Sequence, residues 1–408
     1  MAVKQASARP APANGRLVTS VFLIIMAATF AYFLSVGATI PVLPLFVEGP
    51  LGGTEFSVGL SVGAFSLSAV LIRPLTGRWG DAYGRRFLIL IGGTLVGIAV
   101  AAYVVADSLP VLIAMRLLTG AGEAFFYVGA ASAINDLAPD HRRGEALSFF
   151  SLALYGGIAL GPVIGESVLD ASSFDAVWVV AALLSWAAAL LGVFVSDTRL
   201  DSQPGPRSPG RWMHPAGLLP GTVLATSVWG LAGFNSFVPL YAREVGLSGS
   251  RLVFVVFSVI VLSIRSFGAT IPDRLGPART ARSALVASAI GLAFMGLVGS
   301  PTGVFVGAAI FAIGQALAFP ALMTIAVSGA PVAERGSVVA TFTAFFDLAF
   351  GLGAVTLGVI ANALGYSGTF VAAGVVAAVG FVLMLRLASG GGLAVGKPAR
   401  VEESCEPL

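Results

Sequence analysis

The sequence has little charge and almost no cysteine or histidine. Only 11% of its 408 residues are Asp, Glu, Lys or Arg, whereas soluble domains carry about 25%. Hydrophobic residues make up 57%, and a chain of this length cannot hide so many of them from water. This composition excludes a soluble enzyme, a nucleic-acid-binding protein and a disordered chain. It indicates a protein whose solvent is lipid.

The scarce residue types also limit the chemistry. The single cysteine, Cys405, excludes a disulfide framework. The two histidines, His141 and His214, fall in polar connecting segments, so an intramembrane zinc site or histidine-based catalytic centre lacks its residues. The sequence contains no Walker-type phosphate loop, which argues against direct ATP drive. We therefore expect no metal, no cofactor and no enzymatic activity.

Apolar segments long enough to cross a bilayer recur along the chain. A spanning helix needs about 20 apolar residues. Charges, Pro/Gly breaks and polar clusters separate twelve such segments, and the turn-forming run Ser300-Pro301-Thr302-Gly303 divides the ninth from the tenth. We expect the first segment to be an uncleaved helix rather than a signal peptide. The expected spans are 17–46, 57–76, 87–106, 110–135, 145–168, 176–196, 217–242, 251–271, 283–300, 303–329, 337–362 and 368–387.

The distribution of Lys and Arg predicts the orientation. If the amino terminus is cytoplasmic, the tails and inner connections hold eighteen of these cations and the outer connections hold two. The other three, Arg73, Arg116 and Arg265, lie within spans. By the positive-inside rule, both termini are expected on the cytoplasmic side of the inner (plasma) membrane.

A polar, Pro/Gly-rich stretch near the middle divides the chain evenly. A shift of 192 residues superimposes several landmarks, including Arg73 on Arg265 and Gly84 on Gly276, which indicates duplication. We expect an all-α membrane protein of two pseudo-symmetric six-helix bundles that rock about a shared midplane site. The expected divisions are a cytoplasmic tail 1–16, a bundle 17–196, a cytoplasmic linker 197–216, a second bundle 217–388 and a tail 389–408.

The loop after the second span reads Gly77-Arg-Trp-Gly-Asp81-Ala-Tyr-Gly84-Arg85-Arg86. With the twelve spans and the repeat, this loop resembles the major facilitator superfamily of transporters. The family's best-known motif has a Gly, three residues, an acid, and a Gly followed by two basic residues; its usual Arg after the acid is alanine here. The resemblance covers about 17–388 and implies a transporter that works by alternating access.

The same loop makes physical sense as a gate. Gly84 permits a tight turn with positive φ. Asp81 can accept hydrogen bonds from the amino terminus of a neighbouring helix. Arg85 and Arg86 can hold an inner acid such as Asp136, although a basic loop that only sets the topology would contain the same arginines.

The fourth span contains Arg116 and Glu123, in a pattern that resembles the family's Arg followed by closely spaced glycines. Charged residues within a span face protein or a water-filled cavity. Seven residues are nearly two helical turns, so the two side chains share a face about 10 Å apart along the axis and can line one pathway. Pairing of either residue with another helix is the structural alternative.

The fifth span reads Gly157-Ile-Ala-Leu-Gly161-Pro162-Val-Ile-Gly165-Glu166, which looks like the motif of drug–proton antiporters in the family. Glycines at a spacing of four let helices approach closely, and Pro162 bends the helix. This pattern favours a hinge or a dry seam between the halves, with Gly161 and Pro162 as gating residues. Glu166 departs from the motif, and ordinary helix packing also produces short glycine-rich patterns.

A proton-coupled transporter needs a carboxylate whose environment alternates. Glu123 is the first candidate and Asp347 of the eleventh span the second, with Arg116 nearby as a modulating charge. Asp347 could instead pair with Arg265 or a helix end. The first span has no acid, unlike several relatives in the resembled family, which counts against antiport.

The spans that line the cavity in the resembled family are rich in aromatic residues and poor in fixed charge here, which suits an amphiphilic, drug-like molecule. The leading hypothesis is proton-coupled multidrug efflux by a monomer, with a small-molecule substrate, protons and the bilayer as partners. Uptake or facilitated transport of a metabolite, and a non-transporting receptor, remain as alternatives. The candidate cavity residues are Asn235, Gln315, Phe30, Tyr127, Trp229 and Phe319.

Overall fold

The computed structural model describes residues 17–139, 142–195, 213–268, 274–331 and 334–389. The predicted tails and nearly all of the predicted linker lie outside these residues. All regular structure in the described part of the chain is helical. The helices are α1 Ser20–Thr39, α2 Val42–Glu48, α3 Glu55–Tyr83, α4 Arg85–Ala101, the 3₁₀ turn η1 Ala102–Val105, α5 Leu109–Leu137, α6 Arg143–Ala171, α7 Phe174–Val193, α8 Pro215–Glu244, α9 Arg251–Phe267, α11 Pro277–Val298, α12 Pro301–Ser328 and α13 Arg335–Ser389.

Each of the twelve predicted spans contains helix, although the first holds both α1 and α2 and the last two fall within α13. Within the described residues, ten helical segments are long and apolar enough to cross a membrane, counting α1 with α2 as one and α13 as one. The 17-residue helix α9 occupies the eighth predicted span. Gly365, with a φ of 71°, interrupts α13 and divides it into two spans, which gives the twelfth. The protein is therefore an all-α, multi-pass membrane protein, as predicted.

Turn chemistry decides where the helices end. Gly299 has a left-handed φ of 49°, and the Ser300 hydroxyl accepts a hydrogen bond from the Gly303 N–H at 3.1 Å. The predicted division between the ninth and tenth spans is therefore correct. The predicted first span, by contrast, is interrupted after Thr39, because Pro41 cannot donate the hydrogen bond that would continue α1 into α2.

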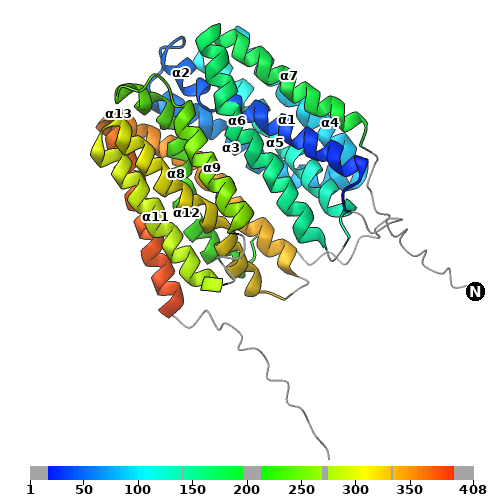
Figure 1. Cartoon of the computed structure of the whole chain (residues 1–408). Helices are drawn as coiled ribbons and strands as arrows, with labels where there is room; N and C mark the ends of the chain where they lie inside the picture. Colours follow the sequence, from blue (N-terminus) through cyan, green and yellow to red (C-terminus); the bar gives the residue numbers. More distant parts are fainter. Residues whose placement is uncertain (1–16, 140–141, 196–212, 269–273, 332–333, 390–408) are drawn as a thin grey trace, which may run out of the picture.

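Two groups of helices are visible in the fold (Figure 1). Helices α1, α3, α4, α5, α6 and α7 pack on one another and form what we call the first half; α8, α9, α11, α12 and α13 form the second half. Packing between the halves joins α3 to α13 and α6 to α9. These are the two main contacts between the halves in the described residues, and α8 makes smaller contacts with α3 and α2.

The closest packing between α3 and α13 lies at one end of the molecule, which we call the far end: it holds α2, the α6–α7 turn and the α8–α9 loop (Figure 1). A Cβ added at Gly59 would overlap the carbonyl oxygen of Ala354. A Cβ at Gly63 would lie 2.6 Å from Val355 Cγ2, and one at Gly358 would lie 2.8 Å from the Glu55 carbonyl oxygen. The halves therefore meet backbone to backbone at the far end.

Candidate functional site

A cluster of charged side chains joins the two halves in the interior of the bundle. Arg73 of α3 forms an ion pair with the carboxylate of Asp347 of α13. Its guanidinium also lies 4.0 Å from Glu123 Oε2 of α5, and 5.5 Å from the ring centroid of Tyr127. Arg73 is thus the counter-ion of two carboxylates from opposite halves, Glu123 and Asp347.

The carboxylates of this cluster are almost entirely removed from solvent. The side chains of Glu123 and Asp347 are each 12% exposed, and that of Arg73 is 25% exposed. Among the described residues, Glu123 Oε2 and Arg73 Nε have no hydrogen-bond partner. Buried charges are costly unless they are paired and hydrogen-bonded, so this incompletely satisfied cluster destabilises the bundle unless a proton or a ligand completes it.

Arg73 is a residue that the sequence analysis did not select. It was recognised as a cation within a span and as the repeat partner of Arg265. A cation within a span needs a counter-charge, and Glu123 and Asp347 were the two candidate acids selected within the spans. That argument could have placed Arg73 between them.

Arg116 has a different surrounding from Glu123, although both lie on α5. Its Nε donates to the Ser61 carbonyl oxygen at 3.0 Å, and its guanidinium lies 4.8 Å from the ring centroid of Phe65. Nη1 lies 3.5 Å from the Tyr103 hydroxyl. Arg116 therefore holds α3 and the turn η1 against α5, the structural alternative foreseen for it, and does not join the charged cluster.

The two halves differ in charge at equivalent positions. The shift of 192 residues that aligns Arg73 with Arg265 also aligns Glu123 with Gln315. Gln315 Nε2 donates to Ser227 Oγ at 2.9 Å and to the Ser227 carbonyl oxygen at 3.2 Å. The acid of the first half is thus replaced by a neutral amide that is bound within the second half.

Most of the predicted gating loop is helical, because α3 continues to Tyr83 and α4 begins at Arg85, so the sharp turn between them is Gly84 alone. Gly84 has a φ of 94°, and its repeat partner Gly276 has a φ of 83°, so both copies use the conformation that only glycine adopts readily. Arg85 Nε donates to Asp136 Oδ2 at 3.1 Å, the pair considered from the sequence. Arg86 is exposed, and a Cβ on Gly77 would meet open space. The side chain of Asp81 lies outside the described residues.

The glycines of the fifth span pack inside the first half rather than between the halves. A Cβ on Gly161 would lie 2.5 Å from the backbone of Gly37, and one on Gly157 would lie 2.7 Å from the Leu34 nitrogen. Both contacts are with α1. The expected dry seam between the halves is instead formed by α3 and α13, and Pro162 lies within α6 beside the α1 contact.

Glu166, the departure from that motif, does join the halves. It is 4% exposed, and its carboxylate accepts hydrogen bonds from the backbone nitrogens of Ser250 at 2.9 Å and Arg251 at 2.8 Å. The Ser250 hydroxyl also donates to it. Nearby, Arg251 Nη1 lies 3.2 Å from Asp170 Oδ2. An acid of α6 thus caps the first turn of α9, where unpaired N–H groups favour a negative charge.

The candidate cavity residues are spread over four helices, and the structure brings only Tyr127 to the charged cluster. The Trp229 indole N–H donates to Thr356 Oγ1 at 3.0 Å. Phe319 packs edge to face on Phe342, with the two ring centroids 5.4 Å apart. Phe30 faces α6 beside Gly156. Asn235 is half-buried on α8.

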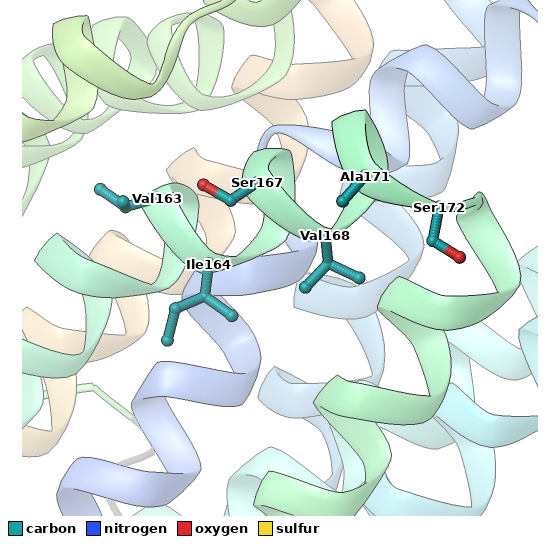
Figure 2. Close-up of a pocket in the computed structure, with 6 residues that line it drawn as sticks. All are labelled: Val163, Ile164, Ser167, Val168, Ala171 and Ser172. Atoms are coloured by element: carbon teal, nitrogen blue, oxygen red, sulfur yellow. The ribbon is translucent and has the colours of Figure 1, made fainter.

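Two apolar grooves lie away from these residues. One, of about 410 Å³, runs along α6 near the far end and is lined by Val163, Ile164, Ser167, Val168, Ala171 and Ser172 (Figure 2). The other, of about 400 Å³, lies on α13 around Val379. In the described part of the chain, no group of three His, Cys, Asp or Glu residues could hold a metal ion.

Known proteins share this sequence pattern and fold. The family model of the Major Facilitator Superfamily matches residues 25–354 and 252–402. An uncharacterized MFS-type transporter of Salmonella typhimurium is 29% identical over 386 residues, covering 90% of this chain and 97% of the relative. One of Burkholderia pseudomallei strain K96243 is 29% identical over 397 residues, covering 94% and 96%.

Solved structures agree in fold at low sequence identity. The human organic anion transporter MFSD10 (TETRAN) aligns with a TM-score of 0.69 at 18% identity, covering 89% of this chain and 98% of that one. A bacterial homolog of the human lysosomal transporter Spinster, inward-facing and unoccupied, aligns with a TM-score of 0.75 at 16% identity, covering 89% and 95%. The chain therefore belongs to the Major Facilitator Superfamily, as a multi-pass membrane transporter of a small molecule and not an enzyme.

Proposed function

We propose that this transporter is a secondary active exporter of small amphiphilic compounds, driven by inward proton flow. The observation that carries the proposal is the position of Arg73 between two buried carboxylates from opposite halves, Glu123 and Asp347. With both acids ionised, one cation faces two negative charges. A single proton on either acid balances the cluster, which makes it a natural proton-binding site.

The contact between halves couples this proton to movement. When the halves separate around the cluster, Asp347 moves with α13 while Arg73 and Glu123 stay with the first half. The acid left without Arg73 then binds a proton more readily, because low-dielectric surroundings disfavour the charged form of a carboxylate that has no cation beside it. A proton taken up in one state is released when the ion pair forms again.

The conformation fits an early step of the export cycle. The Lys/Arg bias of the loops supports cytoplasmic termini in a plasma membrane, which makes the far end the outer end. The backbone contacts at Gly59 and Gly358 and the cap formed by Glu166 close that end. The likeness to an inward-facing, unoccupied transporter supports the same assignment. An exporter in this state can receive cargo from the cytoplasm or the inner leaflet.

The candidate cavity residues support an amphiphilic cargo. Most of them are aromatic, among them Tyr127, Phe319 and Trp229, while the Gln315 amide is already bound within the protein. Such a surface suits a molecule with a large apolar part. Uptake or facilitated transport of a metabolite is the second candidate, since the cluster by itself does not set the direction.

Transport in everted membrane vesicles tests the proposal. Vesicles are acidified inside by respiration, and ethidium and a panel of neutral and acidic amphiphiles are added in turn. We expect a coupled substrate to dissipate the pH gradient with the native protein, and Glu123→Gln and Asp347→Asn to abolish this proton release. Glu145→Gln, which removes an exposed acid paired with Arg142 at 2.7 Å, is the matched control.

Each alternative to this proposal predicts a different experimental result. Substrate movement that survives a protonophore would refute proton coupling and favour facilitated transport. Saturable binding with no flux in proteoliposomes would favour a receptor. Loss of transport in a covalently linked dimer of one native and one inactive chain would contradict a monomeric functional unit.

A further inference from the structure

Arg265, the repeat partner of Arg73, is a cation between the halves that has no ion-pair partner among the described residues. It lies in the last turn of α9, and its guanidinium carbon lies 4.2 Å from the ring centroid of Tyr155 of α6. No hydrogen bond or ion pair of this guanidinium occurs within the described residues, and its Nε is buried without a partner. The contact with the tyrosine face is its only favourable polar interaction there.

The other two arginines within the spans are used differently. Arg73 has two carboxylates, and Arg116 has a carbonyl oxygen and a hydroxyl oxygen as acceptors. Glu166 is occupied by the backbone of α9 at the far end. Three arginines therefore face two available carboxylates in the interior, and Arg265 is the one of the three that has no acceptor within the described residues.

The second half lacks an acid at the position equivalent to Glu123. At the site equivalent to Glu123 stands Gln315, whose amide turns to Ser227 and not to Arg265. An intramembrane charge without a partner is costly, and such residues usually face a polar pathway or a ligand. The planar guanidinium with free donors is suited to bind a carboxylate through two parallel hydrogen bonds.

We propose that Arg265 and Tyr155 form a binding subsite for the anionic group of the cargo, so that the transported amphiphile is an aromatic or aliphatic carboxylate. The guanidinium donates to the carboxylate, and Tyr155 holds the guanidinium from the opposite half. This inference rests on the proposed export function and narrows its substrate class. It separates proton binding, at the cluster of Arg73, Glu123 and Asp347, from anion binding at Arg265.

Binding of two matched probes to the full chain in lipid nanodiscs tests the subsite. We use 2-naphthoate and 2-naphthamide, which have the same shape but differ in charge. The native protein is expected to bind the carboxylate about tenfold or more tightly than the amide, a usual effect for a charged hydrogen bond. Arg265→Gln should remove this preference without weakening amide binding, and Arg265→Lys should restore part of it. Arg279→Gln, which changes an exposed arginine of the same half, should leave the preference intact.

Several outcomes would overturn the inference. Equal affinity for the two probes, no saturable binding of 2-naphthoate, or a preference that survives Arg265→Gln would each show that Arg265 only stabilises the carboxyl end of α9. If the preference appears in phosphatidylcholine discs and is lost when phosphatidylglycerol is added, a lipid phosphate rather than cargo occupies the site.

Different results would refute the anion subsite and the proposed proton coupling. Proton-coupled movement of ethidium without a carboxylate preference would refute the subsite alone. A carboxylate preference that depends on Arg265, in a protein that releases no protons, would refute proton coupling alone.

Discussion

Glu166 caps the amino terminus of α9 from the opposite half: its Oε1 accepts the backbone N–H of Ser250 at 2.9 Å, although 84 residues separate them. Three donors of the first turn of α9 converge on this one carboxylate. The first turn of a helix has N–H groups without partners in the helix, and an acid is the side chain that suits them best. Separation of α6 from α9 at the far end therefore requires these donors to find other acceptors.

We predict that Glu166→Gln opens the far end. The amide keeps an acceptor oxygen but loses the charge, which removes about 1–2 kcal/mol of charge-assisted hydrogen bonding and helix-dipole stabilisation. Electron–electron double resonance between labels on Ser172→Cys and Ser248→Cys, in a Cys405→Ser background, measures the separation. The population with the longer distance should rise several-fold.

The neighbouring ion pair supplies the control. Asp170 and Arg251 have side chains 53% and 40% exposed, so Asp170→Asn should change the same distance distribution little. An unchanged distribution in Glu166→Gln would mean that the cap does not hold the far end closed.

A second prediction concerns the seam between α3 and α13. Gly59→Ala places a methyl group on the Ala354 carbonyl oxygen, where the two backbones touch. We expect this change to disfavour the closed far end and to slow transport, as measured by the same labels and by vesicle flux. The control is Gly77→Ala in α3, whose Cβ meets open space in this conformation and should leave the closed population unchanged. Equal effects of both substitutions would contradict the assignment of the seam.

A third prediction concerns the charged cluster. Arg73→Gln leaves two buried carboxylates without a cation, so the melting temperature in detergent should fall clearly. Loss of one partner of a fully buried ion pair lowers the free energy of unfolding by about 3–5 kcal/mol, and the partial exposure of Arg73 reduces this loss. Adding Asp347→Asn removes one of the two stranded charges. The double variant Arg73→Gln/Asp347→Asn should therefore be more stable than Arg73→Gln alone. Additive losses would show that Arg73 and Asp347 are not coupled.

The sequence was sufficient for the helices and insufficient for the contacts between them. Segment length and turn chemistry located the spans, because a bilayer requires a fixed length of apolar helix and because Ser300 and Gly84 have local roles. Partners across the halves are different, since no local rule connects Glu166 to Ser250 or Arg73 to Asp347. The glycines of α6 were correctly expected to pack closely, but spacing does not reveal that α1 is the neighbour.

The packing of α6 on α1 leads to a fourth prediction, in which two glycines of α6 respond differently to substitution by alanine. Gly161→Ala should destabilise the protein, because its Cβ would lie 2.5 Å from the Gly37 backbone. Gly156→Ala should be neutral or stabilising, since its Cβ would lie 3.5 Å from Phe30 Cε2, an ordinary contact, and alanine favours a helix by up to about 1 kcal/mol over glycine.

Thermal unfolding of the two variants in the same detergent measures this difference. If Gly161→Ala were as stable as Gly156→Ala, α1 and α6 would have to move apart freely, and the contact between α1 and α6 could act as the hinge expected from the sequence. If Gly161→Ala is less stable, the contact between α1 and α6 is a rigid part of the first half, and the movement of transport occurs at the α3–α13 and α6–α9 contacts.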